Sequence, residues 1–197
     1  MTKYNHSLPP WNDRLQRLCF ARGVVKADGM HDILRHRRGC WPEVVESVLA
    51  SVEGFESAVV GDSGLSRQMR DVCELIEGLE IPRESVRLGA SELVRGLLWY
   101  AVDDLQRAHA VFQEESGFLG SYCHGMMHRR EGDFWNANYW FRAAGRPPVG
   151  MFEADFRPEQ LTTACERAGR VVREGEVLQA LAEEAARMFD YIFQRAA

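Results

Sequence analysis

The sequence predicts an all-α protein of about eight helices, and three observations support this fold class. In most segments, apolar residues recur at intervals of three and four positions, which is the spacing of one helix face. Proline and glycine residues separate these segments at positions suited to helix ends. No run of β-branched residues alternates with polar residues as a half-buried strand requires. The sequence therefore predicts a succession of amphipathic helices.

The N-terminal part is expected to hold a short helix at residues 11–22 and a loop at 23–40. The next helix begins at Pro42, because proline at the first helical position loses only an N–H that would be unpaired anyway. Its apolar stripe consists of Val45, Val48, Leu49, Val52, Phe55 and Val59. A second helix is expected at 66–79, and Pro82 stops it.

The remaining helices are expected at about 85–101, 103–115, 118–130, 133–144, 158–174 and 176–195. At 197 residues, with 46% apolar and 27% charged residues, the chain has the length and composition of one globular domain. We expect a single domain (1–197) in four parts: an N-terminal helix and loop (1–40), a helical hairpin (41–80), two further hairpins (85–150) and a C-terminal hairpin (158–197).

Charge and cysteine usage exclude several classes of protein. The net charge of −5 argues against a general nucleic-acid binder, which carries a basic excess. The five cysteines are odd in number and never form a CxxC pair, as expected of reduced thiols. No apolar run approaches the ~20 residues of a membrane span, and the first residues contain no signal-peptide core. A cytoplasmic protein without a membrane partner is expected.

Two neighbouring segments repeat one pattern. The first copy contains Gly96, Trp99, Asp104, Ala108 and Phe112, and the second contains Gly125, His128, Asp133, Ala137 and Phe141. Every pair is 29 positions apart. In each copy, a glycine stands twelve positions before an alanine, and an aromatic residue follows that alanine by four positions. Such a pattern is expected where two antiparallel helices approach closely.

This arrangement resembles the tetratricopeptide-type helix-turn-helix repeat, in which a glycine of the first helix meets an Ala-x-x-x-Phe of the second. The resemblance covers about residues 88–150 and implies closely packed helical hairpins. The period of 29 differs from the usual ~34, and no third copy aligns. The resemblance therefore says little about the partner binding for which that family is known.

The segment from His124 to Arg142, HGMMHRREGDFWNANYWFR, concentrates the polar chemistry of the chain. It resembles a stretch found in bacterial and fungal proteins without an assigned activity, so this likeness implies no reaction. Buried polar groups cost about 1–3 kcal/mol each when they lack a partner. Such a cluster is either a satisfied network or a site that a ligand completes.

His124 and His128 are four residues apart and share one helix face, and Glu131 continues that face. Two histidines and a carboxylate form many zinc and non-haem iron sites, so these three residues are candidate ligands for iron, zinc or manganese. The common zinc-helix motif has glutamate after its first histidine, where this chain has Gly125. A metal-free histidine pair in a polar pocket and purely structural hydrogen bonding remain alternatives.

The preferred functional hypothesis is a pocket for a small ligand or a peptide segment. Its candidate binding residues are His109, Arg129, Arg130, Asn136, Asn138, Tyr139 and Arg142. Arginines bind carboxylates and phosphates in a bidentate manner. The alternatives are a solvated arginine face and aromatic residues that belong to the core.

An enzyme of the hydrolase or oxygenase type is the competing hypothesis. In it, His128 is the general base or a metal ligand, His124 its partner, and Asp133 or Glu131 the orienting carboxylate. Arg129 or Arg142 would clamp an acidic substrate. A third possibility is a homo-oligomer formed through the apolar C-terminal helix, although that helix is also suited to closing the core.

Overall fold

The computed structural model of the protein describes residues 26–27, 41–51, 67–81, 86–87, 90–102, 104–153, 155–168, 171–172 and 176–193. The helix expected at 11–22 lies outside these residues. The same holds for most of the loop expected at 23–40 and for the end of the apolar stripe at Val52, Phe55 and Val59.

The predicted all-α class is confirmed. The described residues form eight helices: α3 (Glu43–Ser51), α4 (Arg67–Glu77), α5 (Ser91–Ala101), α6 (Leu105–Phe112), α7 (Gly117–Glu131), α8 (Phe134–Ala144), α9 (Pro158–Ala168) and α10 (Glu176–Phe193). Two strands of two residues each, β1 (Lys26–Ala27) and β2 (Val171–Val172), pair in parallel.

Two predicted helix boundaries were wrong. The helix expected at 158–174 ends at Ala168, and two β-branched residues after it, Val171 and Val172, pair with β1 instead. The helix expected from residue 85 begins at Ser91. Before it, the backbone N–H of Arg87 donates to the carbonyl of Ile192 at 2.9 Å, a tertiary contact that replaces a helical hydrogen bond.

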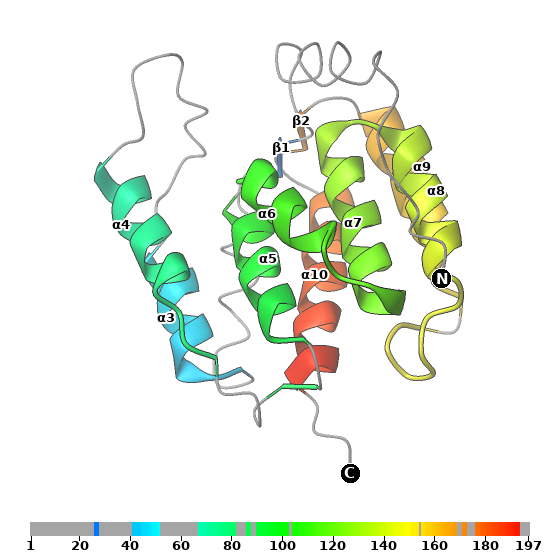
Figure 1. The fold of residues 1–197 in the computed structure, drawn as a ribbon. Coiled ribbons are helices and arrows are strands. Elements are labelled where there is room, and N and C mark those ends of the chain that lie inside the picture. Colours follow the sequence, from blue (N-terminus) through cyan, green and yellow to red (C-terminus); the bar gives the residue numbers. More distant parts are fainter. Residues whose placement is uncertain are drawn as a thin grey trace.

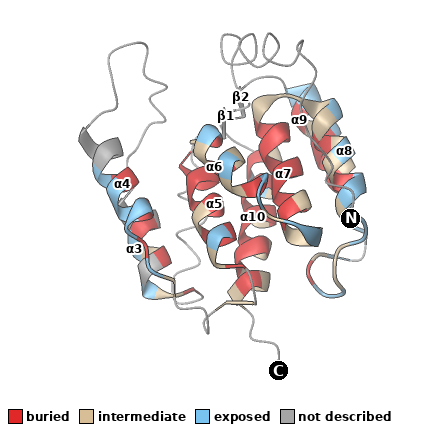
Figure 2. Ribbon diagram, viewed as in Figure 1, coloured by how far each residue is buried: buried red, intermediate tan, exposed pale blue. Residues whose placement is uncertain are grey.

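The helices form a layered bundle (Figure 1). Helices α3 and α4 pack together at one side, α5 and α6 follow, and α7 with α8 and α9 completes the other side. Helix α10 lies behind α5 and α7 and contacts both α5 and α9. The red ribbons of α7 and α10 in Figure 2 mark these two helices as the centre of the core. Every residue from Tyr122 to Arg130 is buried.

The C-terminal helix closes the core. Its apolar face is buried inside the chain, through Leu178, Leu181, Ala182, Ala185, Ala186, Met188, Phe189 and Ile192. The Trp41 indole N–H donates to Asp190 at 2.8 Å, and its ring packs on Phe189. The face considered above for an oligomer contact is therefore used within the monomer.

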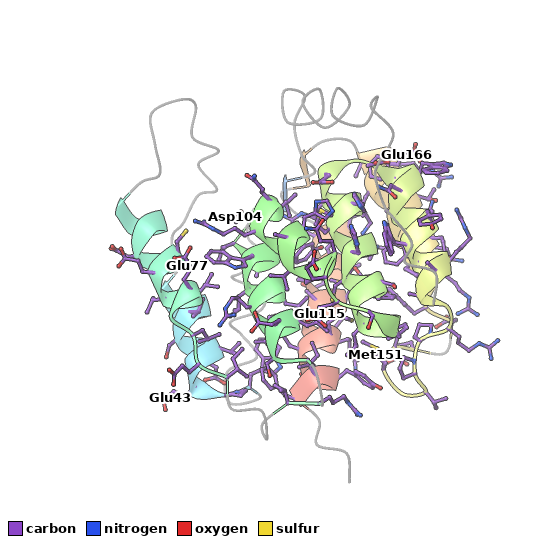
Figure 3. The ribbon with its side chains drawn as sticks, viewed as in Figure 1. Glu43, Glu77, Asp104, Glu115, Met151 and Glu166 are labelled. Carbon is purple, nitrogen blue, oxygen red and sulfur yellow. The ribbon has the colours of Figure 1, made fainter. Side chains whose placement is uncertain are left out.

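The two copies of the 29-residue pattern share their local contacts. A Cβ built on Gly96 would lie 2.4 Å from Phe112, and one on Gly125 would lie 2.7 Å from Phe141. Asp104, labelled at the start of α6 in Figure 3, accepts a hydrogen bond from the Arg107 backbone N–H. Asp133 caps α8 in the same way. The expected close approach at both glycines is confirmed.

Candidate functional site

The site depends on the turn between α7 and α8. Gly132 ends α7 with φ of 78°, a left-handed conformation that glycine adopts without strain. Asp133 then begins α8, and its carboxylate accepts a hydrogen bond from the Asn136 backbone N–H at 3.2 Å. This turn brings the first residues of α8 beside the last turn of α7, so that Asn136 meets His128.

Three histidines come together here. His109 of α6 joins His124 and His128 of α7, and one ring nitrogen from each lies within 4.8 Å of the others. The ring centroids of His109 are 4.8 Å from His124 and 5.3 Å from His128. The sequence placed His109 in the ligand pocket, but its place as the third member of a histidine cluster follows only from the packing of α6 on α7.

Both nitrogens of His128 have polar partners. Nδ1 lies 3.0 Å from Glu131 Oε2, and because an ionised carboxylate can only accept, the proton belongs on Nδ1. The Asn136 amide lies 3.1 Å from Nε2 and donates to it. Glu131 thus orients the ring, and the lone pair of Nε2 accepts from the Asn136 amide, so a metal ion at this nitrogen would have to displace Asn136. The carboxylate–histidine pair is the usual outer support of a histidine that binds metal.

His124 occupies the middle of a stack of rings. Its imidazole is 4.1 Å from the Trp140 ring and 4.7 Å from that of His128, with interplanar angles of 15° and 17°. Both imidazoles therefore face α8, as the repeat pattern predicted. His124 and His128 are buried, at 5% and 4% exposure.

His109 is the most accessible of the three. Its side chain is intermediate in burial, whereas His124 and His128 are buried. Burial lowers the pKa of His109, and the neighbouring His128 lowers it further, against an opposing effect of Glu131. This ring is therefore held in its neutral form, which is the form that binds a metal or accepts a proton.

The donor set fits a divalent transition metal. Three neutral imidazoles form the ligand set of catalytic zinc sites, which keep one position open. With zinc–nitrogen bonds of about 2.0–2.1 Å, ligand nitrogens in a tetrahedral site lie about 3.3 Å apart, so the rings need to close by roughly 1.5 Å at most. Glu131, expected as a third ligand, instead contacts Nδ1 of His128 and is not a member of this group of three.

Arg129 was expected in the ligand pocket or as an anion clamp, and the structure places it in the core. Its guanidinium is fully buried and pairs with Glu184, which also accepts from the Tyr122 hydroxyl at 2.8 Å. Burial alone would lower the pKa of Arg129, but Glu184 reverses this effect and raises it. A substrate anion cannot reach this group. Glu184 was missed because it stands beside Glu183, and a pair of adjacent glutamates in a helix resembles a solvated surface.

The other expected binding residues are divided between the interior and the surface. Arg130 is buried, with its guanidinium 4.9 Å from the Tyr100 ring. Tyr139 is 44% exposed and stacks near Trp135, while Arg142 points outward. Asn138 is half-buried, and its Oδ1 atom is buried without a hydrogen bond from the described residues. His109 and His128 thus lie together, whereas Tyr139 and Arg142 are exposed.

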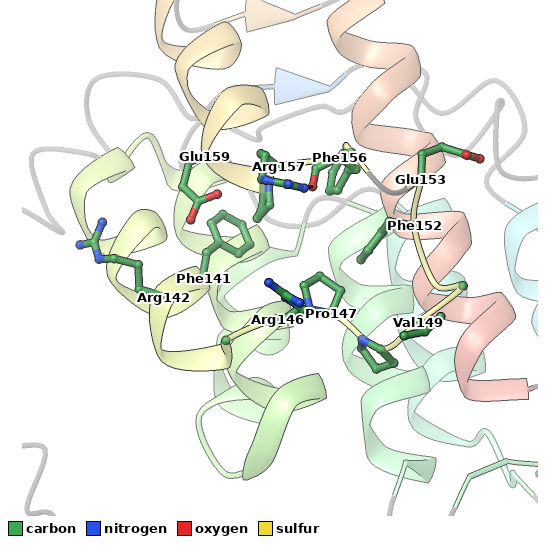
Figure 4. A pocket seen from close by; sticks show the side chains of 14 residues that line it. Phe141, Arg142, Arg146, Pro147, Val149, Phe152, Glu153, Phe156, Arg157 and Glu159 are labelled. Atoms are coloured by element: carbon green, nitrogen blue, oxygen red, sulfur yellow. Dashed lines mark hydrogen bonds between the residues drawn. The ribbon is translucent and has the colours of Figure 1, made fainter.

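A separate cavity of about 780 Å³ opens between the end of α8 and the start of α9 (Figure 4). None of the three histidines lines it. The sequence showed a turn, GRPPVG, at this place and gave no sign of a hollow, because the cavity forms only when the loop packs against α8 and α9.

Comparison with known proteins adds no relative: no family model matches the sequence, and no curated protein or solved structure is significantly similar to it. Within the described helices, none combines the length and apolar character that crossing a bilayer demands. The residues of the site therefore carry the functional argument.

Proposed function

We propose that the protein binds a divalent transition-metal ion, zinc in the first place, through His109, His124 and His128. The observation that carries this proposal is the approach of three ring nitrogens from two helices to within 4.8 Å of one another. The pair of histidines on α7 provides two ligands with fixed spacing. The histidine of α6 supplies the third from a neighbouring helix, as in sites that are assembled by folding.

The surroundings support a reactive site more than a structural one. Structural zinc sites are closed by four protein ligands, whereas catalytic sites have three and leave a position for water or substrate. The described residues offer three nitrogens here, and the Glu131 carboxylate supports the ring of one of them. A bound zinc would lower the pKa of a coordinated water and supply a nucleophile at neutral pH. The proposed class of reaction is a metal-dependent hydrolysis.

Metal analysis tests the first part directly. Purified protein, expressed without a histidine tag, is expected to contain close to one equivalent of zinc, iron or manganese. After removal of the metal, titration with Co²⁺ should give the intense visible absorption of a tetrahedral site. His109→Asn should abolish this signal. Gln106→Asn, which changes an exposed residue of α6 outside the histidine cluster, serves as the control and should retain it.

The double variant His124→Leu with His128→Tyr separates binding from folding. These are the types of residue that a plain helical repeat places at such positions, so the variant should fold with a melting temperature near or above that of the parent, while losing metal. Loss of several kcal/mol of unfolding free energy in the variant, with no metal in the parent, would instead identify the cluster as a structural hydrogen-bond network.

A metal-free ligand pocket is the second candidate. Its support is the buried Oδ1 of Asn138, which accepts no hydrogen bond from the described residues. A ligand with an N–H or O–H group would satisfy this acceptor. The test uses metal-free protein and a small polar ligand whose binding imidazole competes for. If Asn138→Leu abolishes this binding and His109→Asn retains it, this candidate is favoured over the metal site.

A further inference from the structure

The cavity between α8 and α9 has the size of a small-molecule site. Its volume of about 780 Å³ falls within the range of roughly 300–1,000 Å³ that is usual for ligand pockets. The end of α8, the loop that follows it and the first residues of α9 surround it. Since the histidine cluster does not line it, any ligand here is bound independently of the metal site.

One wall of the cavity is aromatic and already fixed in place. Phe141, Phe152 and Phe156 line it. Phe152 stacks on Phe156 with ring centroids 4.7 Å apart and on the buried Tyr122 at 5.3 Å. Phe141 packs against Tyr122 at 5.1 Å. Because these rings are held by one another and by the core, a flat apolar molecule would meet a surface that needs little ordering.

The rim of the cavity is cationic. Three of its five charged lining residues are arginines: Arg142, Arg146 and Arg157. In Figure 4, Arg146 and Arg157 extend toward the space between the phenylalanines, whereas Arg142 points outward. Arg157 is held by a hydrogen bond from its guanidinium to the Phe156 carbonyl at 2.7 Å.

One of the two acidic lining residues, Glu153, has an ion-pair partner outside the cavity. Glu153 lies 3.7 Å from Arg187, outside the cavity lining, so its charge is already balanced. Arg146 forms no ion pair with any residue in the described part of the chain. A guanidinium next to an aromatic wall binds carboxylate, sulfonate or phosphate groups in bidentate fashion.

We propose that this cavity binds an amphipathic organic anion, in which a carboxylate, sulfonate or phosphate group is joined to a flat apolar body. The phenylalanine wall takes the apolar body, and Arg146 with Arg157 takes the charged group. Neither feature alone defines such a ligand, since an aromatic wall without cations accepts neutral molecules equally well. The class of ligand follows from their combination in one hollow.

A pair of fluorescent probes tests this proposal. 8-Anilinonaphthalene-1-sulfonate carries the sulfonate, and N-phenyl-1-naphthylamine has the same aromatic body without it. The sulfonate is expected to bind the folded protein at one site and at least tenfold more tightly than the neutral probe. Arg146→Gln should weaken the sulfonate at least fivefold and change the neutral probe less than twofold. Higher salt should weaken only the sulfonate.

The controls separate the cavity from nonspecific binding. Arg167→Gln removes an exposed arginine of α9 that does not line the cavity, and it should leave both affinities unchanged. Phe156→Leu should weaken both probes, with near-UV circular dichroism showing that the protein remains folded, since loosely packed states also bind this dye. Equal binding of both probes, or equal losses in Arg146→Gln and Arg167→Gln, overturns the proposal. Metal removal should not alter the binding of either probe, so the proposed cavity ligand and the proposed metal site are tested independently of each other.

Discussion

The ring of Phe141 fills the space that Gly125 leaves on the surface of α7. A Cβ at Gly125 would lie 2.7 Å from the Phe141 ring, which is closer than carbon atoms approach in folded proteins. The same relationship joins Gly96 and Phe112 in the preceding pair of helices. Helix α7 can therefore approach α8 only because residue 125 has no side chain.

The change Gly125→Ala tests this contact. In an ordinary helix this substitution stabilises by about 0.5–1 kcal/mol, because glycine loses more backbone entropy on folding. Here it should lower the free energy of unfolding by roughly 1–3 kcal/mol, since overpacking displaces the Phe141 ring. Urea denaturation measures the effect. Phe141→Leu should recover part of the loss in the double variant, and strictly additive losses would contradict direct contact between the two residues.

The capping role of Asp133 predicts a different response. Asp133→Ala should cost about 1 kcal/mol because the Asn136 N–H loses its acceptor. Ser116 occupies the equivalent position of α7 but makes no capping hydrogen bond through its side chain, so Ser116→Ala should have little effect. Asp133→Asn keeps a capping oxygen while removing the charge. If Asp133→Asn is as stable as the parent but loses the proposed metal-dependent hydrolysis, the carboxylate of Asp133 has the orienting role that the sequence analysis suggested.

The buried pair of Arg129 and Glu184 should be costly to break from one side. Glu184→Gln leaves the buried guanidinium without a counter-charge and should destabilise by about 3–5 kcal/mol. The double variant Arg129→Met with Glu184→Leu should be less destabilised than Glu184→Gln, because no charge remains buried. Glu183→Gln, which loosens a half-exposed pair with Arg187 on the same helix, is the control and should cost below about 0.5 kcal/mol. Similar losses for Glu183→Gln and Glu184→Gln would contradict this reasoning.

Acidification should weaken the fold through His109. Its pKa is lowered in the folded protein by burial and by His128, so the unfolded chain binds more protons in the interval below about 6.5. Stability contributed by this residue is therefore present above that interval and is lost as the pH falls through it, by at most about 1.4 kcal/mol per pH unit. Melting temperatures of the parent and His109→Gln between pH 7.5 and 5.5 measure the difference. Parallel curves for the two proteins would show that His109 does not contribute.

The sequence predicted the local elements better than their assembly. Helical periodicity located every helix that the structure describes, because one amphipathic face is visible in a single segment. It extended the α9 segment too far, since the pairing of Val171 with Lys26 depends on a distant partner. The repeat placed Gly96 and Gly125 correctly because their partners stand at the same distance along the chain in each copy.

Residues of the site on one helix could be placed from the sequence, but contacts between helices could not. His124 and His128 could be placed on one face because they share a helix. His109 could be assigned to their cluster only after α6 was packed against α7, and Arg129 could be assigned to the core only once Glu184 of α10 was seen beside it. Contacts between helices far apart in the sequence have no periodicity from which they could be deduced.

The hydrogen bond from Trp41 to Asp190 has a consequence for synthesis of the protein. Its two residues are 149 positions apart, and the Trp41 ring also rests on Phe189. At a translation rate of about 5–20 residues per second, Asp190 is synthesised roughly 7–30 seconds after Trp41. During that interval the pairs α5–α6 and α7–α8 can form from local contacts alone. Helix α3 can pack against α4 and α5 earlier, but Trp41 lacks its native neighbours Phe189 and Asp190 until the last helix has been made.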